Sequence, residues 1–204
     1  MVEQAAIVAP APEMREAWGN ELEDWLDHGE YRHHARLRIL ERLYDEQPFA
    51  SLLDIGCGSG ALLDHFGERG VRGVGFDLSQ AIMSYHRRRG TFPGFVGSVE
   101  QIPLAAGQFE MLTCLGLIEH LADPVAALAE LRRVVKPGGR VMITVPRLFS
   151  AFPLLVPVWY FTGGRYRYGW KNMVGTMYTR ALLERQLRAA GWECEGIWAF
   201  KAGS

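Results

Sequence analysis

The feature that most constrains this chain is an apolar stretch that runs directly into a glycine-rich turn. Residues 52–60 read Leu-Leu-Asp-Ile-Gly-Cys-Gly-Ser-Gly. The apolar residues predict a buried strand over 51–55, and the segment 61–68 after the glycines predicts a helix. Glycines let backbone N–H groups and the start of a helix approach a small ligand closely. The stretch therefore predicts a strand, turn and helix unit that binds a nucleotide-like ligand.

The turn alone is compatible with two kinds of ligand. Gly56, Gly58 and Ala61 satisfy the loose G-x-G-x-x-G/A pattern of dinucleotide sites. Asp77 ends the next apolar stretch about 20 residues further on, where either kind of nucleotide site places a carboxylate for ribose hydroxyls. Asp54 separates the two ligands, because a carboxylate at the end of the first strand repels a pyrophosphate and attracts a cationic amino-acid group. S-adenosylmethionine, with its ammonium and sulfonium, is such a ligand.

Further motifs follow the turn in order. They are Gly-Phe-Asp-Leu-Ser at 75–79, Gly-Ser-Val-Glu-Gln-Ile-Pro-Leu at 97–104, a strand from 109 that leads into Ile-Glu-His-Leu at 118–121, and Val-Lys-Pro-Gly-Gly-Arg-Val at 135–141. With Asp-Ile-Gly-Cys-Gly-Ser-Gly at 54–60, this series resembles the class I S-adenosylmethionine-dependent methyltransferases, and among them the ubiquinone-pathway O-methyltransferases. The resemblance implies an α/β fold, a Rossmann-like doubly wound and mainly parallel sheet with strand order 3-2-1-4-5-(7)-6.

Residue patterns along the chain predict the alternation of helices and strands that such a sheet needs. Helices are expected at 14–27, 31–44, 61–68, 80–88, 124–135 and 179–190. Ser79, Asp123 and Thr179 are expected to cap the helices that begin at 80, 124 and 179. Strands are expected at 51–55, 71–77, near 95, and at 109–115, 140–145 and 192–200. The family's seventh, antiparallel strand has no counterpart before Ser204, so we expect either a shortened form or a truncated chain.

The same patterns divide the chain into four parts. Residues 1–48 form a leader and helices that cover the active site, and 49–147 form the cofactor-binding core. Residues 148–178 form an apolar and aromatic insertion, and 179–204 return to the core as a helix and a strand.

The resemblance assigns cofactor contacts residue by residue. Asp54 organises the ammonium, Asp77 takes the ribose hydroxyls, and Leu78 and Val99 flank the adenine. Ser98 stands where the family often has an acid, and its hydroxyl is a weaker acceptor for the adenine amino group. An arginine on the helix before the first strand, Arg36, binds the cofactor carboxylate, and the backbone carbonyl of Leu115 lies at the end of a strand near the cofactor. The full set of implied contacts is Arg36, Asp54, Gly56, Cys57, Gly58, Gly60, Asp77, Leu78, Ser98, Val99 and Leu115. Arg38 and Arg32 are rivals for the role of Arg36.

Glu119 and His120 are the candidate catalytic residues. His120 can serve as a base for a phenol or alcohol, because its free pKa is about 6.5. Related quinone-type enzymes hold a divalent ion with a further Glu three residues before Glu119, but Gly116 stands there in this chain. We therefore predict no metal site. A third interpretation is that the pair only begins a helix, with the acid favoured near its N-terminus.

The segment 148–170 carries the information about substrate. It is apolar up to 161 and then mixes arginines with aromatic residues, which is typical of a lid over an apolar aromatic substrate or of a membrane interface. The alternatives are packing as an extra helix and a homodimer contact. The sequence thus favours methyl transfer to a small apolar or aromatic acceptor, O-methylation ahead of N-methylation. A non-catalytic module that keeps the cofactor pocket and an NAD-dependent oxidoreductase are the alternatives.

Composition limits the partners and the compartment. The formal net charge of −1 provides no basic field for nucleic acid. Three cysteines cannot all pair, and two of them lie in core motifs, which favours a reducing, cytoplasmic setting with membrane association through 148–170 as a further expectation. No apolar run reaches the roughly 20 residues of a membrane span.

Overall fold

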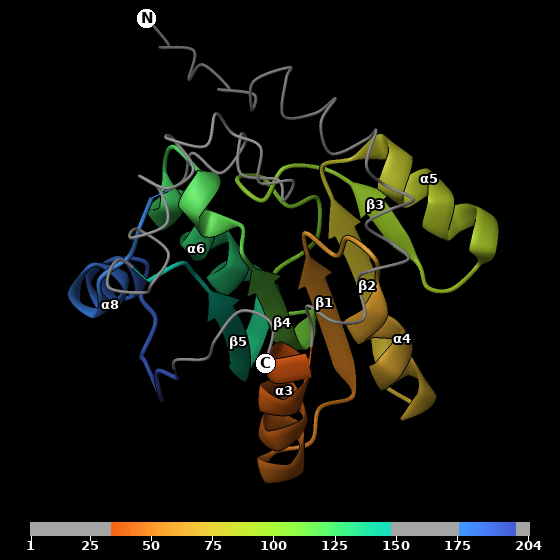
Figure 1. The fold of residues 1–204 in the computed structure, drawn as a ribbon, viewed down its shortest axis with the longest axis horizontal. Coiled ribbons are helices and arrows are strands. Elements are labelled where there is room, and N and C mark those ends of the chain that lie inside the picture. Colours follow the sequence, from red (N-terminus) through yellow and green to blue (C-terminus); the bar gives the residue numbers. More distant parts are fainter. Residues whose placement is uncertain (1–33, 148–175, 199–204) are drawn as a thin grey trace, which may run out of the picture.

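A computed structural model describes residues 34–147 and 176–198 of the chain. In this part, five parallel strands form one sheet in the order β3-β2-β1-β4-β5 (Figure 1). The elements are α3 (His34–Glu46), β1 (Ser51–Ile55), α4 (Ala61–Glu68), β2 (Arg72–Asp77), α5 (Gln80–Arg89), β3 (Gly94–Val96), β4 (Phe109–Leu115), the 3₁₀ turn η2 (Ile118–His120), α6 (Pro124–Val134), β5 (Val135–Thr144) and α8 (Arg180–Ala189). The predicted doubly wound parallel sheet and its order 3-2-1-4-5 are confirmed.

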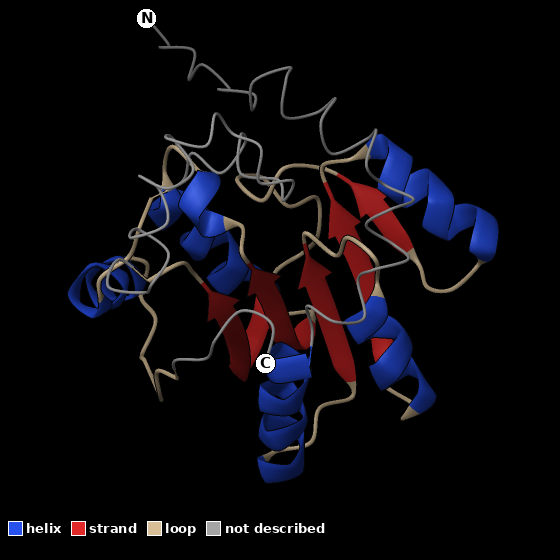
Figure 2. Ribbon diagram, viewed as in Figure 1, coloured by secondary structure: helices blue, strands red, loops and turns tan. Residues whose placement is uncertain are grey.

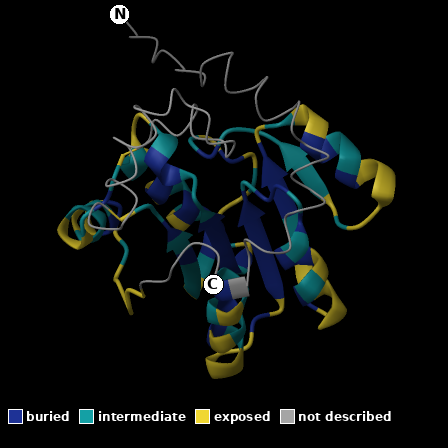
Figure 3. Cartoon of the chain, in the orientation of Figure 1, coloured by how far each residue is buried: buried dark blue, intermediate teal, exposed yellow. Residues whose placement is uncertain are grey.

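The sheet separates two apolar cores, because successive side chains of a strand point to opposite faces. Leu52 and Met111 are register partners on β1 and β4, and they pack with residues of α3, α4 and α5. Leu53 and Leu112, one position further along, pack on the opposite face with residues of α6 and α8. Helices therefore cover both faces of the sheet (Figure 2), and the central strands β1 and β4 are its most buried elements (Figure 3).

The three predicted caps begin their helices. Ser79 Oγ accepts from the N–H of Ile82 at 3.3 Å, and Asp123 Oδ1 accepts from the N–H of Ala126 at 3.0 Å. Thr179 Oγ1 accepts from the third N–H of α8 at 3.1 Å. By contrast, α4 follows Gly60 with no side-chain cap, so its first N–H groups point toward the glycine turn without a side-chain acceptor.

The predicted strand at 192–200 is wrong over its described part, since residues 192–198 form no strand. Side chains, and not a backbone ladder, attach this segment to the core. The Trp192 indole N–H donates to the carbonyl of Leu128 at 2.8 Å, and Glu195 pairs with Arg140 of β5 at 3.1 Å. Most of the segment is exposed, and it forms no ladder with any strand among the described residues.

Strand β5 begins earlier than the predicted start at residue 140. Val135 already pairs with Phe109, and the register then shifts so that Arg140 pairs with Met111. The intervening Lys-Pro-Gly-Gly is accommodated in this irregularity. The predictions for 14–27, for 148–175, and for the ends of the chain up to residue 33 and beyond 198 lie outside the described residues. Within the described part, no helix is long and apolar enough to cross a membrane.

Candidate cofactor site

The glycine turn lies at the carboxyl ends of β1 and β2, where ligands of such sheets bind. Gly56, Gly58 and Gly60 have φ values of +72°, +47° and +75°, a conformation that favours glycine. The N–H groups of Gly56 and Cys57 both donate to the carbonyl of Phe76, at 2.7 and 3.1 Å. The turn that begins on β1 is therefore fixed to the end of β2.

Asp77 fastens the turn from the other strand. Its Oδ2 accepts from the N–H of Gly58 at 3.2 Å, and its Oδ1 accepts from the N–H of Ser79 at 2.8 Å. Burial raises the pKa of this carboxyl, and the two backbone hydrogen bonds counteract that rise. A carboxylate oxygen has two acceptor sites, so each oxygen can accept one further hydrogen bond. Asp77 can thus hold the turn and bind two ligand hydroxyls at the same time.

Asp54 is buried at the end of β1, with 4% of its surface exposed. Burial raises its pKa to about 6, although a hydrogen bond from Thr113 Oγ1 to Asp54 Oδ1, 2.5 Å long, opposes the rise. The charge of Asp77 raises the pKa further, and the charge of Arg36 lowers it. Our reading of the sequence missed Thr113. The signal was available in the strand register, because Thr113 on β4 is the direct partner of Asp54 on β1.

Arg36 and Glu119 meet beside the end of β4. A methyl group placed on Gly116 would lie 3.5 Å from Glu119 Oε1 and 3.7 Å from an Arg36 guanidinium nitrogen, so both side chains border this glycine. Burial raises the pKa of Glu119 to about 7, and Arg36 lowers it in part. Glu119 Oε2 is buried with no hydrogen-bond partner among the described residues. Of the rival arginines, Arg38 is exposed and Arg32 lies outside the described residues.

Gly116 also bears on the metal question. Its φ of +70° lies in the left-handed region, where a residue with a side chain is strained, although a methyl group there would meet Glu119 only at ordinary contact distance. Within the described ranges, no group of three or more His, Cys, Asp or Glu residues is arranged to hold a metal ion. His120 follows Glu119 in η2, just after the carboxyl end of β4, and is half-buried. Its backbone N–H donates to the carbonyl of Leu117 at 3.0 Å.

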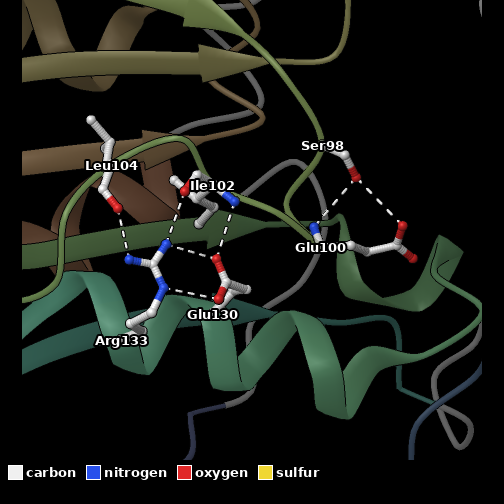
Figure 4. A network of polar contacts seen from close by, with 6 residues as sticks. All are labelled: Ser98, Glu100, Ile102, Leu104, Glu130 and Arg133. Carbon is white, nitrogen blue, oxygen red and sulfur yellow. Dashed lines mark hydrogen bonds and ion pairs between the residues drawn. The ribbon is translucent and has the colours of Figure 1, made fainter. Parts of the chain in front are cut away.

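The other predicted contacts differ in how open they are. Leu78 is 41% exposed, a large apolar side chain that offers a surface to a flat ring. Ser98 is half-buried, and its Oγ accepts from the N–H of Glu100 at 3.3 Å (Figure 4). Val99 is 4% exposed and belongs to the core, so packing already accounts for its side chain. Leu115 is half-buried at the end of β4.

The loop that carries Ser98 is held by α6. Arg133 donates to the carbonyls of Leu104 and Ile102 at 2.7 and 2.8 Å, and it pairs with Glu130 at 2.8 Å. Glu130 in turn accepts from the N–H of Ile102 at 3.1 Å, which closes the network in Figure 4. The third motif is therefore positioned by a charged pair on a helix, and not only by the sheet.

Comparison with known proteins identifies the family to which this arrangement belongs. A model of a methyltransferase domain matches residues 28–196, which is most of the chain. This chain belongs to the methyltransferase-domain family. Membership confirms the resemblance predicted from the ordered motifs.

Relatives of this methyltransferase domain are similar over only part of their length. A ubiquinone biosynthesis O-methyltransferase of Pseudomonas aeruginosa strain UCBPP-PA14 is 34% identical over 99 residues, which cover 46% of this chain and 43% of that protein. The chain thus spans about half the length of the curated relatives it matches.

Solved structures share the fold. A methyltransferase of Thermotoga maritima described as S-adenosylmethionine-dependent has a TM-score of 0.68 at 23% identity, covering 89% of this chain and 81% of its own. The 1,6-didemethyltoxoflavin N1-methyltransferase of Burkholderia thailandensis has a TM-score of 0.62 at 19% identity, covering 92% and 81%. That enzyme was solved with 1,6-didemethyltoxoflavin and S-adenosylhomocysteine bound.

Proposed function

We propose that this methyltransferase domain binds S-adenosylmethionine at the carboxyl ends of β1, β2 and β4 and transfers its methyl group to a small apolar or aromatic acceptor. Family membership indicates this cofactor, and one solved neighbour holds S-adenosylhomocysteine, the product it leaves. The observation that carries the proposal is the pair of buried carboxylates, Asp54 and Asp77, on either side of a glycine turn. A buried carboxylate is costly where its hydrogen bonds and neighbouring charges do not offset the loss of water, and a cationic ligand lowers that cost.

The chain's residues fit this ligand in their chemistry. Asp77 has acceptor capacity left for ribose hydroxyls, and Leu78 offers an exposed apolar surface for the adenine. Asp54 supplies negative charge for the ammonium, and Arg36 supplies positive charge for the carboxylate of the amino-acid end. When bound, S-adenosylmethionine supplies an electrophilic methyl group on a sulfonium. Much of the acceleration can then come from holding donor and acceptor in line, which can contribute effective molarities of about 10⁵ M or more.

The proposed acceptor carries a hydroxyl, so O-methylation is favoured over N-methylation. Support comes from relatives named ubiquinone biosynthesis O-methyltransferase and from two proton-accepting groups, Glu119 and His120, at the end of β4. Burial places the pKa of Glu119 at about 7, where a carboxyl can exchange a proton near neutral pH. A neighbour named as an N1-methyltransferase shares the fold, but at 19% identity it does not favour N-methylation in this chain.

Calorimetry tests the cofactor half of the proposal. We expect S-adenosylmethionine and S-adenosylhomocysteine to bind and NAD to bind far more weakly. Tighter binding of NAD, or no binding of either sulfur compound, would refute the proposal. Asp77→Ala serves as the matched variant, since it should lose the binding that the wild type shows.

Transfer of a labelled methyl group tests the acceptor half. The wild type is incubated with labelled S-adenosylmethionine and parallel panels of phenols, catechols and aromatic amines. O-methylation is supported if the wild type labels the hydroxyl compounds and Asp77→Ala does not. Label only on amines contradicts it, and cofactor binding without transfer to any panel or to a cell extract favours a non-catalytic module.

Contact with a membrane through 148–170 is a separate proposal, and so are a homodimer and a cytoplasmic location. They rest on the sequence, because this segment lies outside the described residues. Co-sedimentation with liposomes compares the wild type with a deletion of 148–161. Equal pelleting of the two proteins would remove the membrane proposal.

A further inference from the structure

The carbonyl of Gly58 has an unusual partner, the side chain of a buried histidine. His86 is 2% exposed on α5, and its Nε2 lies 2.7 Å from the Gly58 oxygen. That distance is at the short end of the range for N–H···O hydrogen bonds. The N–H of the same glycine donates to Asp77. The glycine is therefore held through both its N–H and its carbonyl.

The contact fixes which nitrogen of His86 carries hydrogen. A carbonyl oxygen can only accept, so Nε2 must be the donor. In the neutral ring Nδ1 is then an acceptor, and the Thr91 hydroxyl lies 3.4 Å from it. Both ring nitrogens thus have a partner, and the imidazole is oriented at each end.

Aromatic packing holds the ring in this orientation. The rings of His86 and Phe92 lie 4.4 Å apart between centroids, inclined by 36°. Phe92 in turn fills the space beside two motif glycines, since a methyl group on Gly60 or Gly75 would lie 2.3 or 2.5 Å from its ring atoms. The histidine, the phenyl ring and the two glycines form one packed unit behind the turn.

We infer that His86 is a positioning residue for the proposed cofactor site, holding the Gly58 peptide so that the turn and Asp77 stay in register for the ligand. The inference rests on the proposed function, and it adds a residue outside all of the ordered motifs. His86 acts through the turn and need not touch the ligand. Its loss leaves a buried carbonyl without a donor, and the turn must move to find another.

Substitutions at 86 separate this role from simple packing. Leucine removes the donor while keeping an apolar side chain, whereas glutamine can place an amide N–H close to the position of Nε2. We expect His86→Leu to weaken binding of S-adenosylhomocysteine about tenfold, equivalent to about 1.4 kcal/mol. His86→Gln should bind within about threefold of the wild type, because the hydrogen bond to Gly58 is restored.

Ile82→Ala is the control for stability, because Ile82 is equally buried on the same helix at 2% exposure. It should lower the melting temperature without changing the dissociation constant. Equal affinities of wild type and His86→Leu would overturn the inference, and so would a loss in His86→Gln as large as that in His86→Leu. A wild type that binds no S-adenosylhomocysteine would instead overturn the proposed function, so the two failures are distinguishable.

Discussion

Replacing Asp54 by asparagine should have two effects: it should stabilise the ligand-free protein, and it should weaken the binding of the cofactor. The carboxylate is 4% exposed, and burial raises its pKa from an ordinary 3.8 to about 6. A group whose pKa is raised on folding favours the folded state below its unfolded pKa, and that contribution disappears as the pH rises through the folded pKa. At pH 7.5 the ionised Asp54 therefore costs about 3 kcal/mol of folding free energy.

The pH dependence of this cost gives the sharper test. At pH 5 most of the folded protein carries a protonated Asp54, and the cost falls to about 1.6 kcal/mol. The amide oxygen in Asp54→Asn still accepts from Thr113, but its NH₂ group lacks a partner, which costs about 1–3 kcal/mol, so the net gain in unfolding free energy at pH 7.5 is about 0–2 kcal/mol. Whatever that constant penalty is, the stability gap between variant and wild type should narrow by about 1.4 kcal/mol between pH 7.5 and pH 5.

Urea unfolding of both proteins at the two pH values measures the gap. A gap that stays constant, or that widens toward pH 5, would refute the argument that burial penalises this charge. Calorimetry at pH 7.5 supplies the second half, where Asp54→Asn should bind S-adenosylmethionine about 10- to 100-fold more weakly, the value of a lost charge-assisted hydrogen bond. A variant that is more stable and binds equally well would show that the charge at 54 does not serve the ligand.

Three further predictions use the same assays. Gly60→Ala should lower the free energy of unfolding by about 1–3 kcal/mol, because the φ of Gly60 is +75° and the ring of Phe92 fills the space beside it. Gly67→Ala, in open space within α4, should raise that free energy by about 0.5–1 kcal/mol. Equal effects of the two substitutions in urea unfolding would contradict the strain argued for Gly60. Asp77→Asn should lower cofactor affinity, since the amide group cannot accept from both backbone N–H groups that Asp77 holds, and unchanged calorimetry would exclude Asp77 from the site. Removal of the base at the end of β4 should lower kcat for methyl transfer about 10²- to 10⁴-fold with unchanged cofactor affinity. A larger loss in His120→Ala than in Glu119→Gln identifies His120 as that base, the reverse identifies Glu119, and unchanged kcat in both variants would exclude a base at this position.

Local patterns were sufficient for most of the fold. The caps at Ser79 and Asp123 and the apolar run at 109–115 are decided by neighbouring residues, and the structure has them where the sequence predicts. The strand predicted at 192–200 is wrong over 192–198, where the residue pattern is suitable but no described strand pairs with the segment. Its described residues attach to the core through Trp192 and Glu195 instead.

The positions of the candidate site residues were predictable where neighbouring residues in the sequence determine them, and less so where contacts between distant parts of the chain do. Asp54 and Asp77 were recognisable because their place at strand ends is a local property. Thr113 and His86 were missed because their roles depend on contacts between distant parts of the chain, one through strand register and the other through the packing of α5 against the turn. Val99 shows the opposite case, a motif residue whose side chain lies in the core.

The buried carboxylates connect the stability of this domain with its function. Asp54 and Glu119 both have raised pKa values, so near neutral pH each is buried at a cost that the ligand-free fold must bear. Apolar residues of similar size at these positions would give a more stable protein. A ligand that brings a positive charge to Asp54 lowers this cost and binds the folded state alone, and it therefore stabilises the fold by mass action. In this account, the same burial that weakens the empty domain gives it affinity for a cationic cofactor.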